Sequence, residues 1–129
     1  MKRPLIAISL AAVLSCSGLT EVEQLRERMD GLRADILALI GDPLCDSVDE
    51  CRYVGFGQKV CGGPLKYLVY SISRTDSVQL KTLVDEHRRL NKEWNVKSGA
   101  ISPCDIPLIP VLAKRDGRCV DLRQTPKAP

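Results

Sequence analysis

The sequence has few of the residues on which catalysis and metal binding depend. Its 129 residues include a single histidine, His87, and only five aromatic residues. No Cys-x-x-Cys pair is present, which gives a zinc site poor support. Neither a Gly-x-Ser-x-Gly nor a His-Glu-x-x-His motif occurs. Because the common hydrolases carry such motifs, the sequence favours a non-enzymatic protein that needs neither a metal nor another cofactor.

Charge of one sign is lacking as well. Nineteen lysines and arginines are offset by 16 aspartates and glutamates, which leaves a net charge of +3 at pH 7. The basic residues are not gathered in one segment. Since a nucleic-acid-binding surface needs concentrated positive charge, we expect no nucleic acid among the partners.

The one long apolar run lies at the N-terminus. Lys2 and Arg3 precede residues 5–14, in which Ser9 is the only polar side chain. A membrane-spanning helix needs roughly 20 apolar residues, so this run is too short to cross a bilayer. Its length and its basic flank are typical of a secretory signal peptide, which we predict over residues 1–15.

The tetrapeptide from Val13 to Cys16 resembles the lipobox of bacterial lipoproteins, with valine where leucine is commoner. The resemblance implies cleavage before Cys16 and acylation of its thiol, and two or three acyl chains suffice for stable anchoring in a lipid bilayer. Ser17, rather than an aspartate, follows; in the sorting pattern of Gram-negative bacteria this favours the outer membrane, on its periplasmic or surface face. The alternative is an ordinary signal peptide in which Cys16 is incidental.

Cleavage would leave a chain long enough for one domain but poor in large side chains. Such small domains rely on disulfides in an oxidising compartment. We therefore predict a small disulfide-stabilised α+β domain over residues 20–123, with two amphipathic helices and a short, mostly antiparallel sheet of about four strands. Residues 16–19 would form a lipidated spacer, and residues 124–129 a disordered tail.

A first helix is predicted over residues 20–40, ahead of a cysteine-rich core over residues 44–123. Thr20 and Glu23 have the spacing of a capping box. One apolar stripe follows, formed by Val22, Leu25, Met29, Leu32, Ile36 and Leu39. Two interpretations stay open: the stripe docks on the protein's own sheet, which we favour, or it forms a coiled coil with a second copy.

A second helix is predicted over residues 76–95. Its apolar face carries Leu80, Leu90 and Trp94 together with His87. A general base needs a nucleophile and an orienting group beside it, which this pattern does not supply. We therefore interpret His87 as a packed histidine at the edge of the core.

Short strands are predicted at residues 52–56 and 67–73, the second apolar enough for a central strand. Asp116-Gly117 predicts a tight hairpin that places Lys114 opposite Cys119. Alternation then assigns Val111, Ala113, Val120 and Leu122 to the core-facing side of the hairpin and Cys119 to the more polar side.

Residues 45–119 resemble a group of cysteine-rich exported bacterial proteins of unknown function. The matching landmarks are Cys51-Arg52, Cys61-Gly62-Gly63-Pro64, residues 67–71, Thr75-Asp76, Gly99 with Ser102 and Cys104, and residues 116–119. The resemblance implies a fold unit and no particular activity. Members of this group carry a further cysteine at the position of Lys114.

This departure implies a pairing for the cysteines. If related proteins join positions 114 and 119 across the hairpin, Cys119 becomes a free thiol here, able to link two copies into a homodimer. The other four cysteines would pair as Cys45–Cys51 and Cys61–Cys104. The pairing of Cys45 with Cys61 and of Cys51 with Cys104 stays open.

These features together predict a non-enzymatic binding or structural module in the cell envelope, with an unknown protein partner. An inhibitor of a secreted or periplasmic hydrolase is the alternative, because small disulfide-tied domains present rigid loops. Its inhibitory loop would be residues 46–50 or residues 62–66.

Overall fold

The computed structural model describes residues 18–124. The signal peptide, Cys16 and the tail from residue 125 onward lie outside the described residues, so these predictions stay untested. The chain forms two long helices, α1 (Glu21–Ile40) and α2 (Ser77–Ser98), and one short 3-10 helix, η1 (Val48–Glu50). Four strands accompany them: β1 (Cys51–Phe56), β2 (Lys66–Ser71), β3 (Leu112–Arg115) and β4 (Arg118–Asp121).

The first helix begins at the predicted capping box. The backbone N–H of Glu23 donates to Thr20 Oγ1 at 3.3 Å, and the Glu23 carboxylate accepts from the backbone N–H of Thr20 at 2.8 Å. Gly41 ends the helix with a φ of 54°, a conformation that glycine adopts without strain. The sequence prediction for this helix is confirmed.

The second helix also begins and ends where local chemistry directs it. At its start, the Asp76 carboxylate accepts hydrogen bonds from the backbone N–H groups of Val78 and Gln79. At its end, Gly99 adopts the left-handed conformation that commonly terminates helices. The helix therefore extends three residues beyond the predicted end at residue 95.

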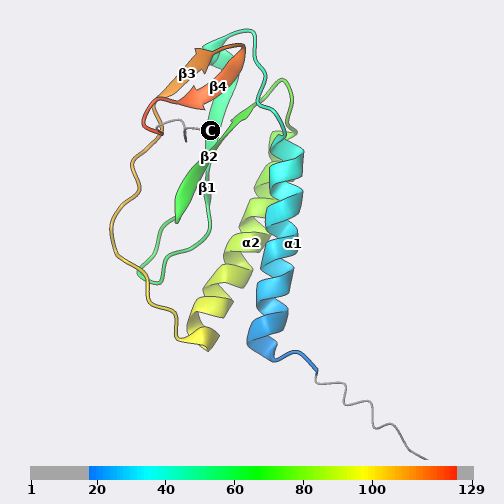
Figure 1. Ribbon diagram of the computed structural model, residues 1–129, viewed down its shortest axis with the longest axis vertical. Helices are drawn as coiled ribbons and strands as arrows, with labels where there is room; N and C mark the ends of the chain where they lie inside the picture. The colour runs from blue at the N-terminus through cyan, green and yellow to red at the C-terminus, as the bar shows by residue number, and fades with distance from the viewer. Residues whose placement is uncertain (1–17, 125–129) are drawn as a thin grey trace, which may run out of the picture.

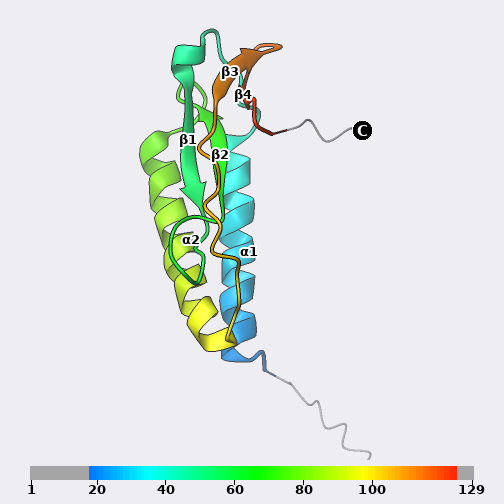
Figure 2. The same cartoon turned by 90° about the vertical axis from the view of Figure 1, so that its left-hand side faces the viewer.

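The molecule has three layers (Figure 1). The two helices pack side by side on one face of the β1–β2 sheet. The β3–β4 hairpin and the extended segment that leads into it lie on the other face, as the turned view shows (Figure 2). The helices and the hairpin thus lie on opposite faces of the β1–β2 sheet.

The strands form two separate antiparallel sheets of two strands each, and not one sheet of about four. The expectation that residues 67–73 form a central strand is wrong, because within residues 18–124 β2 pairs with β1 alone. Its apolar character has another cause. Leu68 and Tyr70 pack against the core between the helices and the sheet, whereas Val69 on the opposite face packs against the cluster of buried cysteines. Both faces of β2 are therefore covered without a second neighbouring strand.

The main core lies between the helices and the sheet. Its buried members are Ile36, Ile40, Phe56, Leu80 and Val84. The C-terminal half of the α1 stripe is thus buried inside its own chain, against α2 and the sheet. Among residues 18–124, no helix is long and apolar enough to cross a membrane.

His87 belongs to this packed interior. Its ring stacks on Phe56 with the ring centres 4.2 Å apart, and no described residue accepts a hydrogen bond from, or donates one to, its Nδ1. Burial lowers the pKa of His87 below its ordinary value, and the Arg33 charge lowers it further. The side chain is therefore a neutral packing residue, buried more deeply than the predicted edge position.

Candidate functional site

The β3–β4 hairpin has the predicted register but turns the opposite face inward. Lys114 lies opposite Cys119, and Arg115 opposite Arg118, as expected. Cys119, however, is only 3% exposed, whereas Val111 and Leu122 are exposed. The assignment of Cys119 to the outer side is therefore wrong. The side of β4 that carries Cys119 faces inward because residues 43–45 pair with the start of this strand. The Cys119 N–H donates to the Pro43 carbonyl and the Cys45 N–H donates to the Gly117 carbonyl, both at 2.9 Å.

The disulfide bonds correct the predicted pairing. Cys51 is bonded to Cys119, with 5.5 Å between their Cα atoms. The free cysteine among residues 18–124 is the buried Cys45. The predicted Cys45–Cys51 bond and the predicted free thiol at Cys119 are thus wrong, and the homodimer through Cys119 loses its basis. Cys61 and Cys104 form the second pair, as expected, with Cα atoms 5.9 Å apart.

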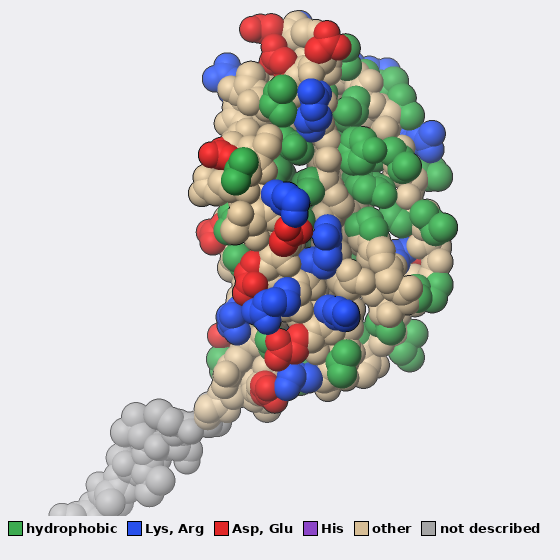
Figure 3. All heavy atoms as spheres, turned by 180° about the vertical axis from the view of Figure 1, so that it is seen from behind, with side chains coloured by type: hydrophobic (Ala, Val, Ile, Leu, Met, Phe, Trp, Pro, Cys, Tyr) green, Lys and Arg blue, Asp and Glu red, His purple; other side chains and the backbone are tan. Residues whose placement is uncertain are grey.

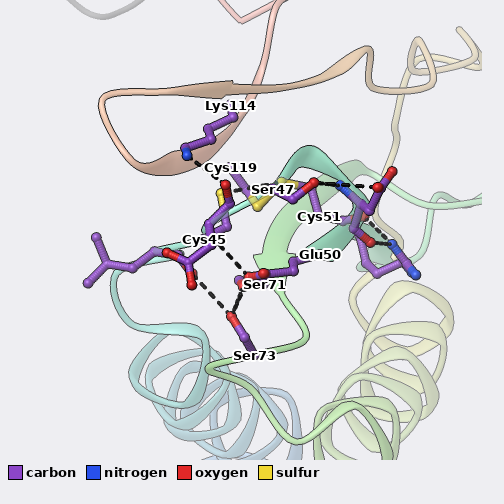
Figure 4. The surroundings of a disulfide bond; sticks show 12 residues. Cys45, Ser47, Glu50, Cys51, Ser71, Ser73, Lys114 and Cys119 are labelled. Atoms are coloured by element: carbon purple, nitrogen blue, oxygen red, sulfur yellow. Dashed lines mark hydrogen bonds between the residues drawn. A yellow bond between two sulfur atoms is a disulfide. The ribbon is translucent and has the colours of Figure 1, made fainter.

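Cys45, Cys51 and Cys119 form a compact sulfur cluster, which Figure 4 shows under the hairpin. The Cys45 Sγ lies 3.8 Å from the Cys51 Sγ, and all three sulfurs lie within 4.8 Å of one another. Three thiolates at this spacing would suit a soft metal ion, but two of these sulfurs are bonded to each other. The chemistry open to this state is exchange: attack of the Cys45 thiolate on Cys51 would form a Cys45–Cys51 bond and release Cys119 as the thiolate.

A hydrogen-bond network borders the sulfur cluster (Figure 4). The Glu50 carboxylate accepts from Ser73 Oγ at 2.7 Å and from the Asp46 N–H at 3.2 Å, and Ser73 also contacts Ser71. The Ser73 hydroxyl is the main reason that the pKa of Glu50 lies below its ordinary value. Lys114 Nζ donates to the Asp46 carbonyl at 2.6 Å. The loop of residues 46–50, which had no predicted structure, is thereby held against the hairpin.

A second feature is the stretch between α2 and β3, which we call the clamped segment (residues 102–111). Its first half is held at three positions within residues 102–105. Cys104 is bonded to Cys61, and Ser102 Oγ accepts the Val60 N–H at 3.0 Å. Lys59 Nζ donates to the Asp105 carboxylate at 2.7 Å and also to the Asp105 carbonyl oxygen. Lys59 is only 5% exposed, so this ion pair ties the segment to the interior of the protein.

The other end of the clamped segment is held by β4. The Val111 N–H donates to Asp121 Oδ1, and the Val111 carbonyl accepts the Leu122 N–H, both at 2.9 Å. Pro110, directly before this junction, is buried. The segment is therefore fixed on both sides of residues 106–109.

The residues between the two clamps carry their apolar side chains outward. Ile106 is 87% exposed, Leu108 69% and Ile109 56%, while Pro107 is half-buried. Figure 3 shows hydrophobic side chains gathered along the side of the molecule that carries this segment. Neighbouring exposed apolar side chains of this kind mark interaction sites.

The sequence prediction of inhibitory loops did not find this segment. The loops of residues 46–50 and 62–66 each expose one large apolar side chain, Val48 and Leu65. The signal that could have found it is the Ile-Pro-Leu-Ile-Pro pattern at residues 106–110, because its two prolines disfavour both a helix and a central strand.

A groove of about 1010 Å³ separates β2 from β4. Its lining combines apolar side chains such as Val69 and Leu122 with charged ones such as Arg115. The groove is a second surface at which a partner can bind, and a cross-linking group at Leu122 would detect such binding.

The comparisons with known proteins supply no relative. No protein-family model matches the chain, and neither the curated proteins nor the solved structures contain a match.

Proposed function

We propose that this protein is an envelope-anchored binding protein, held to the bilayer through acylated Cys16, that presents the clamped segment to a protein partner. The lipobox resemblance at Val13 to Cys16 supports the anchor. The observation that supports the binding role is the exposure of Ile106, Leu108 and Ile109 between two fixed ends.

The contacts at both ends of the clamped segment are important because they order its backbone in the unbound protein. Ordering the backbone of a flexible residue costs about 1–2 kcal/mol, and a free segment would lose this amount at each position on binding. The Cys61–Cys104 bond, the Lys59–Asp105 pair and the contacts of Val111 impose much of that order in the unbound protein. Preorganisation of this kind raises the affinity for a partner that recognises the same extended shape.

The anchor and the binding role need separate experiments. Metabolic labelling with an alkyne fatty acid should mark the wild type and not Cys16→Ser, and only the wild type should sediment with the envelope. Equal labelling of the two proteins would disprove the anchor.

The binding role is tested by a photo-reactive amino acid placed at Leu108 of the full chain in its native envelope. A specific cross-linked product is expected from Leu108 and not from Val78, which is 78% exposed on α2 and serves as the matched control. Cross-linking from Leu122 alone would assign the partner to the groove between β2 and β4.

Inhibition of a secreted or periplasmic hydrolase is the second candidate function. The observation that favours it is the same pair of fixed ends, since tight-binding protease inhibitors keep their backbone nearly unchanged on binding. In this role the protein would protect the envelope from a degrading enzyme.

A further inference from the structure

We propose that the clamped segment is an inhibitory loop for a serine endopeptidase with an apolar S1 pocket, and that Leu108 is the side chain that fills this pocket. The Leu108–Ile109 peptide bond would then lie, uncleaved, beside the catalytic serine. This inference rests on the proposed role of the clamped segment as the binding site for a protein partner.

The shape of the segment is the first argument. Residues 101–111 belong to no helix or strand, and they run along the outside of the molecule (Figure 2). Among residues 18–124, no hydrogen bond engages the backbone of residues 106–109. An endopeptidase binds its substrate as an extended chain and pairs with the substrate backbone, as in strand addition. The free N–H and C=O groups of Ile106, Leu108 and Ile109 are available for this pairing.

The prolines fix which peptide bond can occupy the active site. A bond that precedes proline is a poor fit, because the ring nitrogen has no N–H and the ring crowds the site of attack. This excludes Ile106–Pro107 and Ile109–Pro110. A proline at the S1 position is equally unsuitable, because its side chain is closed onto its own backbone. This excludes Pro107–Leu108 and Pro110–Val111.

One further bond is excluded by the clamp itself. The Asp105–Ile106 bond would require the Asp105 side chain to enter the S1 pocket, but that carboxylate is bonded to the buried Lys59. Leu108–Ile109 is thus the bond within residues 105–111 that meets every requirement.

The chemistry of Leu108 defines the class of protease. A branched apolar side chain that is 69% exposed in the free protein gains by transfer into an apolar pocket of matching size. A trypsin-type pocket contains an aspartate at its base, and leucine would leave that carboxylate buried without a partner. The target is therefore an enzyme of chymotrypsin, elastase or subtilisin specificity.

The two clamps also explain how the bond would escape hydrolysis. On one side the chain is held by Cys61–Cys104 and Lys59–Asp105, and on the other by the contacts of Val111 with β4. New chain ends formed at Leu108 and Ile109 would stay close together, because both sides remain attached to the protein. Departure of the leaving amine, which an ordinary substrate completes at once, is thereby opposed.

The pattern Pro-x-x-Pro also suits grooves that bind polyproline helices, but the orientation of the prolines argues against such a partner. Pro110 is buried and Pro107 half-buried, so the rings face the body of the protein. A polyproline-binding groove reads those rings directly. The side chains offered to a partner here are isoleucine and leucine.

The test is titration of the full chain against chymotrypsin, pancreatic elastase and subtilisin, with trypsin as the negative probe. We expect stoichiometric inhibition of at least one of the first three enzymes and none of trypsin. Leu108→Asp should raise the inhibition constant by about 100-fold, as for a central hot-spot residue. Leu108→Arg should transfer inhibition to trypsin. Val78→Asp, at an apolar position that is exposed to a similar degree, should leave inhibition unchanged.

Three results would overturn the inference: no inhibition of any of the three enzymes by the wild type, equal inhibition by Leu108→Asp, or rapid cleavage of Leu108–Ile109 without a stable complex. Retention of the disulfides and helicity of each variant, measured by peptide mapping and circular dichroism, excludes misfolding as the cause. Cross-linking from Leu108 to a partner other than a protease would refute the inhibitor while leaving the binding role intact. Absence of any product from Leu108 would refute the binding role itself.

Discussion

Different interactions stabilise two halves of the molecule. One half consists of the helices and the β1–β2 sheet, and the other consists of the hairpin and the clamped segment. The first buries large apolar side chains, among them Ile36, Leu80 and Leu90, which are almost inaccessible to solvent. The second relies on the Cys51–Cys119 bond, the Cys61–Cys104 bond and the Lys59–Asp105 pair. The proposed binding role would account for this difference. A segment that must keep its apolar side chains outside cannot be held by burying them, so covalent bonds and ion pairs hold it instead.

The largest effect should come from breaking the Cys51–Cys119 bond, one of the two disulfides that join the two halves. Cys51 and Cys119 are 68 residues apart, and closing a loop of that length stabilises the folded chain by about 4 kcal/mol in the chain-entropy model. The double variant Cys51→Ala/Cys119→Ala should lose a free energy of unfolding of that order, as measured by urea denaturation. A loss below about 1 kcal/mol would show that the hairpin half is held chiefly by its noncovalent contacts.

The next effect should come from the core between the helices and the sheet. Leu80 is 1% exposed, and truncating a leucine at such a site costs about 3 kcal/mol through lost transfer energy and the cavity left behind. Leu80→Ala should therefore lower the urea midpoint strongly, whereas Val78→Ala, two residues away and exposed, should change stability by less than about 0.5 kcal/mol. Equal effects of the two substitutions would contradict the assignment of Leu80 to the core.

Cys45 should affect the identity of the disulfides more than the stability of the fold. Cys45→Ala removes a small buried group next to the bond between Cys51 and Cys119, at an expected cost of about 1 kcal/mol. Wild-type protein held at alkaline pH in mild denaturant should accumulate a Cys45–Cys51 bond, detected by non-reducing peptide mapping. Cys45→Ala should keep the Cys51–Cys119 bond and form no exchanged bond. Absence of the exchanged bond in the wild type would rule out exchange within the sulfur cluster.

The smallest effect, confined to the clamped segment, should come from pH. The hydrogen bond from Lys59, followed by its positive charge, lowers the pKa of Asp105 below its ordinary value. The ion pair therefore contributes fully above about pH 4 and is lost as the pH falls through the lowered pKa of the folded state. The Val60 amide, which donates to Ser102 Oγ in the clamped segment, should lose protection against hydrogen exchange below about pH 4 in the wild type, measured relative to the intrinsic exchange rate at each pH. Asp105→Asn should exchange faster at every pH, with no such transition; an identical pH profile for the variant would assign the transition to another group.

Local signals in the sequence were sufficient to predict the helices and the hairpin register. Thr20 with Glu23, Asp76 before α2, and Asp116-Gly117 each act on residues no more than a few positions away. Such contacts can be inferred without knowledge of the rest of the fold.

The disulfide pairing and the inward face of the hairpin could not be predicted in the same way. Both alternating sets of hairpin residues contain apolar members, Leu112 with Cys119 and Val111 with Leu122, so periodicity alone cannot choose between the faces. The choice is made by the bond from Cys119 to Cys51 and by the pairing of residues 43–45 with β4. These contacts join distant parts of the chain. The clamped segment was missed for the same reason, because its anchors at Lys59, Val60 and Cys61 lie more than 40 residues earlier.

The direction of α1 has a consequence for how the molecule would stand on a membrane. The helix has 20 residues and starts at Glu21, five residues after the proposed attachment point at Cys16 in the sequence. Its far end lies at the same end of the molecule as the hairpin (Figure 1). A helix of this length spans about 30 Å. If acylated Cys16 is anchored in the bilayer, α1 would hold the hairpin at a fixed distance from the lipid headgroups. The clamped segment, which runs along the same long axis, would then meet enzymes diffusing above the membrane surface.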